Sequence, residues 1–227
     1  MPYNPNKQFY QDPVAVGTLA PIVKTAAATE NLTAFQFYEA QTVAAQLGVH
    51  EFLQTAMAGA NNDFDFIARQ AGVNSPAVRI AFIVAGASTP ASCTVAGGDI
   101  TVNVATNGAS AAISTAAQIK ALIEATPAAT ALVVANLQNG NDGTGVVAAF
   151  AITALVAPAA TTVDCKLQVS FDGVTYTDSA LVFTQKVNAA GAESKSQTAV
   201  PVWGRWVLTI GGVTHIAAVS ITAVYKP

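Results

Sequence analysis

Two histidines, His50 and His215, are the residues of this sequence best suited to general acid–base chemistry near neutral pH. His50 lies beside Glu51, where we expect a helix to start, and His215 lies in the strand-like segment VTHIAAV. An enzyme would need a nucleophile or a second proton-transfer group within hydrogen-bond reach. No spacing in the sequence pairs a cysteine or a serine with either histidine. The sequence therefore predicts a protein without catalytic residues.

Two aspartates, Asp63 and Asp65, have the spacing of a carboxylate pair. They alternate with Phe64 and Phe66 in the segment NNDFDF. We interpret this segment as a loop or cap in which the aspartates bind the backbone and the phenylalanines are buried anchors.

The segment NGNDGTG carries Asn139, Asn141 and Asp142, whose side-chain oxygens are of the type that binds calcium. Calcium-binding repeats of similar composition need the repeat, and here the segment occurs once. Because Asn, Asp and Gly tolerate positive φ, a simple turn is favoured. Neither GGDI nor GASTPAS has the strand–loop–helix context or the lysine of a phosphate-binding loop. We expect no metal and no cofactor.

Aromatic residues near the C-terminus are the candidates for binding a sugar or a protein partner: Tyr176, Trp203, Trp206 and Tyr225. Successive side chains of a strand point to opposite faces, so Trp203 and Trp206 face opposite ways. At most one of the two then belongs to a core, and the other is a candidate partner contact.

The chain is short of charge: of 227 residues 52% are apolar and 10% are charged, against about 25% charged in an ordinary domain. Such a surface suits a subunit covered by neighbours better than a lone monomer. The net charge of −3 and the scattered basic residues exclude nucleic acid as a partner. The best membrane-span candidate, residues 146–160, is too short and contains Pro158, so we expect no membrane partner. Cys93 and Cys165 have no metal-type spacing and predict free thiols.

Residues 1–75 form the first of three predicted regions. Their start, MPYNPNKQFYQDP, is polar and proline-rich, which predicts an extended arm without a secretory leader. After the arm we expect two helices, over residues 31–47 and 49–59, because Leu32 and Leu47 belong to a set of apolar residues at roughly helical spacing.

Residues 76–160 form the second region, a small unit in which a helix covers a sheet. RIAFIVAGA, GDITVNVAT, ALVVANLQ and VVAAFAITAL predict strands. Between them STAAQIKALIEAT predicts a helix, with Thr115 and Gln118 at the spacing of a capping box and Pro127 as its end.

Residues 161–227 form the third region, which predicts an antiparallel β-sandwich. One strand has apolar residues at every second position: Val163, Cys165, Leu167, Val169 and Phe171. Asp172-Gly173 predicts a hairpin turn, and residues 188–198 (NAAGAESKSQT) predict a loop. The predicted fold class is α+β: an N-terminal extended arm with helices, a small helix-on-sheet unit and a C-terminal sandwich.

The segments GDITVNVAT, STAAQIKALIEATPAATALVVANL and NGNDGTGVVAAF, in this order and spacing, resemble a module of structural proteins of tailed bacteriophages and prophages. The resemblance covers about a third of the chain. KLQVSFDGVTYTD also resembles strand pairs in sandwich domains of phage decoration, fibre and cell-surface proteins. The resemblance implies a virion component and leaves its position in the particle open.

We therefore expect a structural virion protein, assembled in the host cytoplasm, that binds the major capsid protein or other virion subunits as a homo-oligomer. Capsid decoration or cementing is the first expectation. A tail, connector or fibre-base component is one alternative, and a carbohydrate-binding surface module is the other. A trimer and an exchange of the arm between subunits are left open. The candidate contacts are Tyr3, Phe9, Tyr10, Trp203 and Trp206.

Overall fold

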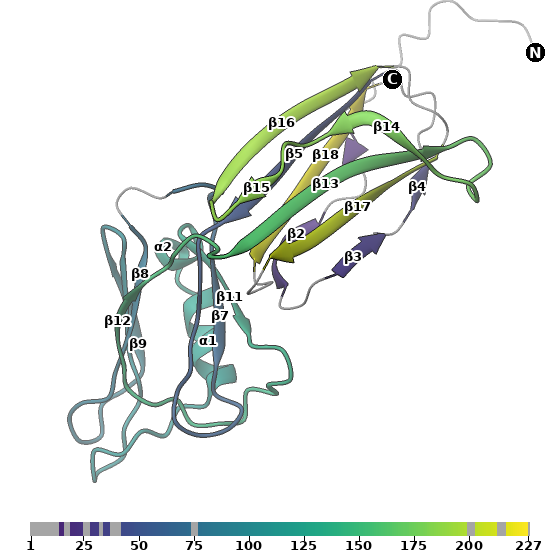
Figure 1. Ribbon diagram of the computed structural model, residues 1–227. Coiled ribbons are helices and arrows are strands. Elements are labelled where there is room, and N and C mark those ends of the chain that lie inside the picture. The colour runs from purple at the N-terminus through teal and green to yellow at the C-terminus, as the bar shows by residue number, and fades with distance from the viewer. Residues whose placement is uncertain are drawn as a thin grey trace, which may run out of the picture.

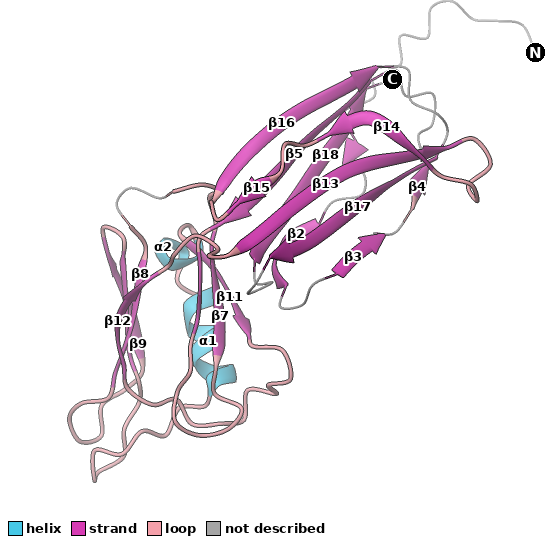
Figure 2. Ribbon diagram, in the orientation of Figure 1, coloured by secondary structure: helices cyan, strands magenta, loops and turns pink. Residues whose placement is uncertain are grey.

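Strands dominate the computed structural model of this chain, which has several sheets and few helices. The structure describes residues 14–15, 19–24, 28–31, 34–36, 42–73, 77–198, 203–212 and 217–226. Two hydrophobic cores divide them into two bodies, at the upper right and lower left of Figure 1. We call the first the two-sheet body. The second contains the helices, cyan in Figure 2, and we call it the helix body.

The two-sheet body consists of two antiparallel sheets that face each other. The β13 sheet has the order β14 (Thr177–Val182), β13 (Thr161–Ser170), β17 (Trp203–Gly212) and β3 (Ala28–Asn31), with β15 (Lys186–Val187) on β13 and β4 (Phe35–Gln36) on β17. The β5 sheet has the order β1 (Val14–Ala15), β18 (Ala217–Lys226), β5 (Thr42–His50) and β16 (Gly191–Thr198), with β2 (Leu19–Lys24) on β18. Residues 14–50 thus add strands to both sheets of the C-terminal part of the chain.

Alternating side chains fill the core between these two sheets. On β13 the buried residues are Val163, Cys165, Leu167 and Val169, as their spacing predicts. The prediction for Phe171 is wrong, because β13 ends at Ser170 and the Phe171 residue is 83% exposed.

The predicted helices over residues 31–47 and 49–59 are wrong. The first segment lies across β3, β4 and β5, and the second contains β6 (Phe52–Gln54) and a loop. The residues of β5 that belong to the two-sheet core follow the period of two of a strand: Val43, Ala45, Leu47 and Val49. β5 pairs with β16 and β18, both far away in sequence, and such non-local pairing overrides local helical spacing. The loop predicted over residues 188–198 is also wrong for most of its length, because Gly191–Thr198 form β16.

The helix body has the strands and the helix that residues 76–160 predict, together with strands from residues 51–73. Its β8 sheet has the order β12 (Phe150–Ala154), β8 (Arg79–Ile83), β10 (Asp99–Asn103) and β9 (Ser92–Ala96). Its β7 sheet has the order β11 (Val133–Leu137), β7 (Phe64–Ala68) and β6. Helix α1 (Ala116–Glu124) packs into the shared core through Ala116, Ile119 and Ile123, and the short α2 (Pro127–Thr130) follows.

Helix α1 begins at the predicted capping box. Thr115 Oγ1 accepts a hydrogen bond from the backbone N–H of Gln118 (3.4 Å), and the Gln118 side chain accepts one from the backbone N–H of Thr115 (3.0 Å). These bonds satisfy N–H groups that a helix start otherwise leaves unpaired. Pro127 is the first residue of α2, where its missing N–H costs nothing.

His50 joins the two bodies at the end of β5. Its Nδ1 lies 2.8 Å from the carbonyl oxygen of Ala68 on β7, and its Nε2 lies 2.7 Å from Ser220 Oγ on β18. The backbone N–H of Gly72 donates to the carbonyl of Val49 (3.1 Å) across the same junction. Burial lowers the pKa of His50, so the side chain that links the bodies is a neutral imidazole near pH 7.

Candidate functional site

The two tryptophans of β17 point to opposite faces of the β13 sheet, as their spacing predicts. Trp206 is fully buried in the two-sheet core, with its ring 6.1 Å from that of Phe183. Trp203 is half-buried on the outer face, beside the turn that follows β13. Trp203 is therefore the tryptophan that a partner could contact.

The turn after β13 is held rigid by Asp172. The carboxylate accepts hydrogen bonds from Ser170 Oγ (2.7 Å) and from the backbone N–H groups of Val174 and Thr175 (both 2.8 Å). These bonds, the one from Ser170 first, hold the pKa of Asp172 well below its usual range. Gly173 adopts φ +75°, and a Cβ there would lie 3.0 Å from the Trp203 ring. The predicted Asp172-Gly173 turn is therefore confirmed and is packed on Trp203.

The turn presents two large apolar side chains to solvent, since Phe171 is 83% exposed and Val174 is 82% exposed. Beside them the guanidinium of Arg205 stacks on the Tyr176 ring, 4.2 Å from its centroid. Such a cation–π contact orients both groups. We call this set the turn surface: Phe171, Val174, Tyr176, Trp203 and Arg205.

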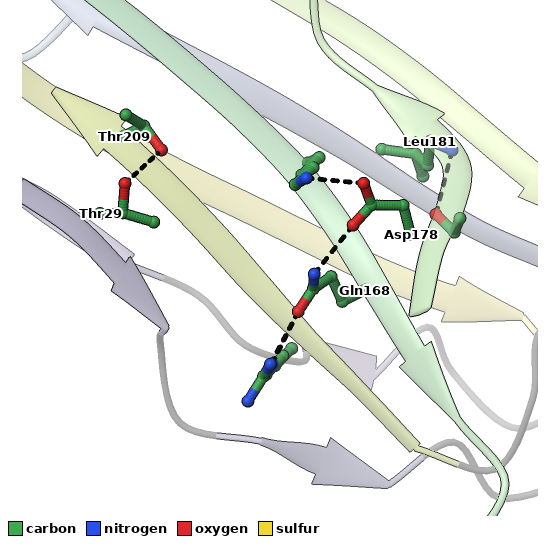
Figure 3. A network of polar contacts seen from close by, with 8 residues as sticks. Thr29, Gln168, Asp178, Leu181 and Thr209 are labelled. Carbon is green, nitrogen blue, oxygen red and sulfur yellow. Dashed lines mark hydrogen bonds and ion pairs between the residues drawn. The ribbon is translucent and has the colours of Figure 1, made fainter. Parts of the chain in front are cut away.

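A polar network continues from the turn surface across the outer face of the β13 sheet (Figure 3). Arg205 donates to Gln168 Oε1 through Nε (3.0 Å) and Nη2 (2.8 Å), and Gln168 Nε2 donates to Asp178 Oδ1 (2.8 Å). Asp178 Oδ2 also lies 2.6 Å from Lys166 Nζ. The hydrogen bonds from Lys166 and then Gln168 lower the pKa of Asp178. The arrangement can present a fixed apolar tip and an ordered row of hydrogen-bonding groups to one partner.

Sequence reasoning missed most of the turn surface. It placed Phe171 in the core and gave no role to Val174 or Arg205. The Asp172-Gly173 pair could have indicated that Phe171 and Val174 are exposed. A turn that follows a strand directly leaves the apolar residues on either side of it outside the sheet.

The structure also brings together a serine and a histidine that the sequence did not pair, Ser220 and His50. The pair is enclosed: His50 is 3% exposed, and a Cβ at Gly48 would lie 2.7 Å from Ser220 Oγ and 2.9 Å from His50 Nε2. The second nitrogen of the imidazole faces a backbone carbonyl. This geometry supports a structural bond better than a nucleophile that needs room for a substrate.

Both cysteines are free, as predicted. Cys165 lies in the two-sheet core, where burial raises its thiol pKa to about 12. Cys93 is half-buried on β9, and burial raises its pKa too. Both thiols are therefore kept in the unreactive protonated form near neutral pH.

The aspartates of NNDFDF have separate structural partners. Asp63 accepts hydrogen bonds from the Met57 backbone N–H (2.6 Å) and Thr55 Oγ1 (3.1 Å), which is the predicted loop role. Asp65 lies within β7, not in a loop, and accepts one from the side chain of Gln54 (2.8 Å). Burial raises the pKa of Asp65. The flanking Phe64 and Phe66 are fully buried, as predicted.

The segment NGNDGTG forms the predicted turn. Asp142 accepts hydrogen bonds from the hydroxyl (2.7 Å) and the backbone N–H (3.0 Å) of Thr144, which lower its pKa. The side chain of Asn141 donates to the backbone carbonyl of Asp63 (3.0 Å). Within the described ranges, no group of three or more His, Cys, Asp or Glu side chains is placed to hold a metal ion.

Several sequence candidates lie outside the described residues: Tyr3, Phe9, Tyr10 and His215. The backbone of Tyr225 belongs to β18. In the described part of the chain, no helix has the length and hydropathy of a membrane span. Comparison of the chain with protein-family models, with curated proteins and with solved structures found no match.

Proposed function

We propose that this protein is a structural subunit of a large assembly, a tailed-phage virion, and that it decorates and stabilises the capsid. The observation that carries the proposal is the exposure of large apolar side chains on both bodies: Ile113, Val146, Ile152, Val156, Phe171 and Val174 are each 47% or more exposed. Exposed apolar side chains that lie together, as Phe171 and Val174 do on one turn, mark protein interaction sites, whereas isolated exposed apolar residues are ordinary. The low charge of the whole sequence supports the same reading.

We infer further that the two-sheet body is a β-sandwich and that its turn surface is a point of attachment. The hydrogen bonds of Asp172 hold the backbone of the turn at Val174 and Thr175, so binding of this turn to a partner would cost little backbone entropy. Burial of apolar area contributes about 25 cal/mol per Å² before the costs of association. Repeated over a capsid shell, contacts that are weak alone become strong together.

Co-sedimentation with capsids that lack this protein tests the proposal. The full chain should bind at a fixed, saturable ratio to the major capsid protein, and the double variant Phe171→Ser/Val174→Ser should bind much more weakly. Val187→Ser is the matched control, since Val187 is an exposed valine (52%) away from the turn. Absence of binding by the full chain contradicts the capsid role.

A second variant tests the predicted arm with Tyr3, Phe9 and Tyr10. Removal of residues 1–13 leaves every described strand in place, because β1 starts at Val14. Loss of capsid binding by this shortened chain assigns the contact to the arm. Unchanged binding leaves the turn surface as the attachment point.

The tail, connector or fibre-base role is the alternative within the virion. It requires the same exposed apolar surface but predicts rings or fibres of the isolated protein and no binding to capsid shells. Electron microscopy of the purified chain together with the co-sedimentation experiment separates the two roles.

A carbohydrate-binding role is favoured by one observation: Trp203 lies on the same outer face as the Arg205–Gln168–Asp178 network. A half-exposed indole beside ordered polar side chains is a common way to bind a sugar ring. Glycan binding by the full chain should then be lost in Trp203→Ala and retained in Val187→Ala. Trp206→Ala is unsuitable for this test, because Trp206 belongs to the core.

A further inference from the structure

An open groove lies on the outer face of the β8 sheet, next to the edge strand β12. Its volume is about 610 Å³, and none of the residues that line it is charged. The walls include Ala81 and Ile83 of β8, Thr101 of β10, and Phe150 and Ile152 of β12. Helix α1 lies on the opposite, core-facing side of this sheet (Figure 2), so it does not cover the groove.

A β-bulge exposes Ile152, one of the residues that line the groove, as an apolar knob at its rim. Phe150 pairs with Phe82 and Thr153 pairs with Ile80, so two residues of β12, Ala151 and Ile152, lie opposite the single residue Ala81. Bulges bend an edge strand and redirect side chains. Ile152 is consequently 50% exposed, and Ile83 on the neighbouring strand is 41% exposed. The exposed Ile152 side chain and the groove that it lines therefore lie on one face of the sheet.

The lack of charged side chains on this face favours a partner surface that is also uncharged. Residues 143–163 contain no Asp, Glu, Lys or Arg. Arg79 and Asp99, two residues before Ala81 on β8 and Thr101 on β10, neutralise each other through a 2.6 Å ion pair. A charged side chain from a partner would lie unpaired in the groove, which is costly. An identical uncharged face meets no such penalty and brings its own apolar knob.

We propose that this face binds a second copy of the chain in a two-fold contact, with Ile152 of each copy in the groove of the other. A two-fold contact uses the same patch on both subunits and so requires a patch that is complementary to itself. Side chains make the contact, because the bulge bends the β12 edge away from regular backbone pairing. The proposal deepens the structural role proposed above, in that it names the surface through which copies meet, and it is tested without capsids.

The test is the molar mass of the purified full chain in sedimentation equilibrium. The natural protein should have about twice the 23.1 kDa of one chain. Ile152→Lys and Ile152→Asp should each weaken self-association at least about 100-fold, since like charges then meet at the two-fold axis. An equimolar mixture of the two variants should regain the dimer mass through the opposite charges. The control Val187→Lys, with a nearly equal exposed fraction (52%), should remain dimeric.

Restoration of the dimer in the mixture shows that both variants are folded and that the two Ile152 positions face each other. A monomeric natural protein overturns the proposal, as does a trimer, an Ile152→Lys variant with unchanged mass, or a mixture that stays monomeric. Any of these outcomes can occur with intact capsid binding by the full chain. Conversely, a dimer that fails to bind capsids rejects the decoration role and retains the two-fold contact.

Discussion

The outer faces of the β13 sheet and the β8 sheet are both solvent-facing surfaces of β-sheets, yet their chemistry differs. On the β13 sheet Lys166, Gln168, Asp178 and Arg205 form a continuous polar network. On the β8 sheet the corresponding area beside β12 carries apolar and uncharged side chains around an open groove. A sheet face that stays in water needs polar side chains, and a face that becomes covered does not. The difference supports the proposal that two copies of the chain meet through the β8 face.

Each body has its own hydrophobic core, so a substitution in one core should destabilise that body more than the other. Trp206→Ala should have the largest effect of this kind. Loss of this fully buried ring leaves a cavity in the two-sheet core, with an expected cost of about 3–5 kcal/mol in the free energy of unfolding. Urea unfolding measures the cost. Alkylation of Cys165, in the same core, should accelerate more than that of Cys93 in the helix body. Equal acceleration of both thiols would mean that the bodies open together.

Trp203→Ala is the matched control on the same strand. Because Trp203 is half-buried on the outer face, its loss should cost less in the free energy of unfolding than that of Trp206. An equal or larger cost would contradict the assignment of Trp206 to the core and Trp203 to the surface.

His50→Ala should weaken the junction between the bodies. The substitution leaves the Ala68 carbonyl and the Ser220 hydroxyl without their partner, with an expected cost of about 1–3 kcal/mol. In the natural protein burial lowers the folded-state pKa of His50 from 6.5. This part of the stability is therefore present above pH 6.5 and is lost as the pH falls through the folded-state pKa. Unfolding curves of both proteins at pH 8 and below pH 6 measure it; a constant difference between them would reject the linkage.

Thr115→Ala should affect the helix body alone. Loss of the hydroxyl that caps α1 is expected to cost about 1 kcal/mol. Thr115→Ser keeps the oxygen and should restore most of that stability. Alkylation of Cys93 should respond more than that of Cys165, the reverse of the Trp206→Ala pattern. If alkylation of the same cysteine were accelerated more in both Trp206→Ala and Thr115→Ala, the two cores would not be independent.

Asp172→Asn should produce the smallest effect and a pH-dependent one. The folded-state pKa of Asp172 lies below its ordinary value of 3.8, so the carboxylate stabilises the fold above pH 3.8 and this contribution is lost as the pH falls further. The natural protein should therefore be more stable than the variant at pH 6, and the gap should narrow below pH 3.8. Denaturant unfolding at both pH values checks this. A gap that widens in acid would contradict the role of Asp172 in the turn.

Local patterns in the sequence were sufficient for several elements. The alternation of β13, the capping box of α1 at Thr115 and Gln118, and the turns at Asp172 and Asp142 depend on residues close together in the chain. Their hydrogen bonds and their two faces are set by neighbours within a few positions, so sequence spacing contains the necessary information.

The tertiary structure decided the rest. Residues 42–50 form β5 because β16 and β18 provide hydrogen bonds from positions more than 140 residues away, and the polar segment GAESKSQT becomes β16 for the same reason. The exposure of Phe171 depends on where β13 ends, and that of Ile152 depends on a bulge against Ala81. Because strand pairing joins distant segments, its partners and register cannot be read from local composition. The sequence by itself determined a charge-poor chain, and its folding decided which apolar residues stay on the surface.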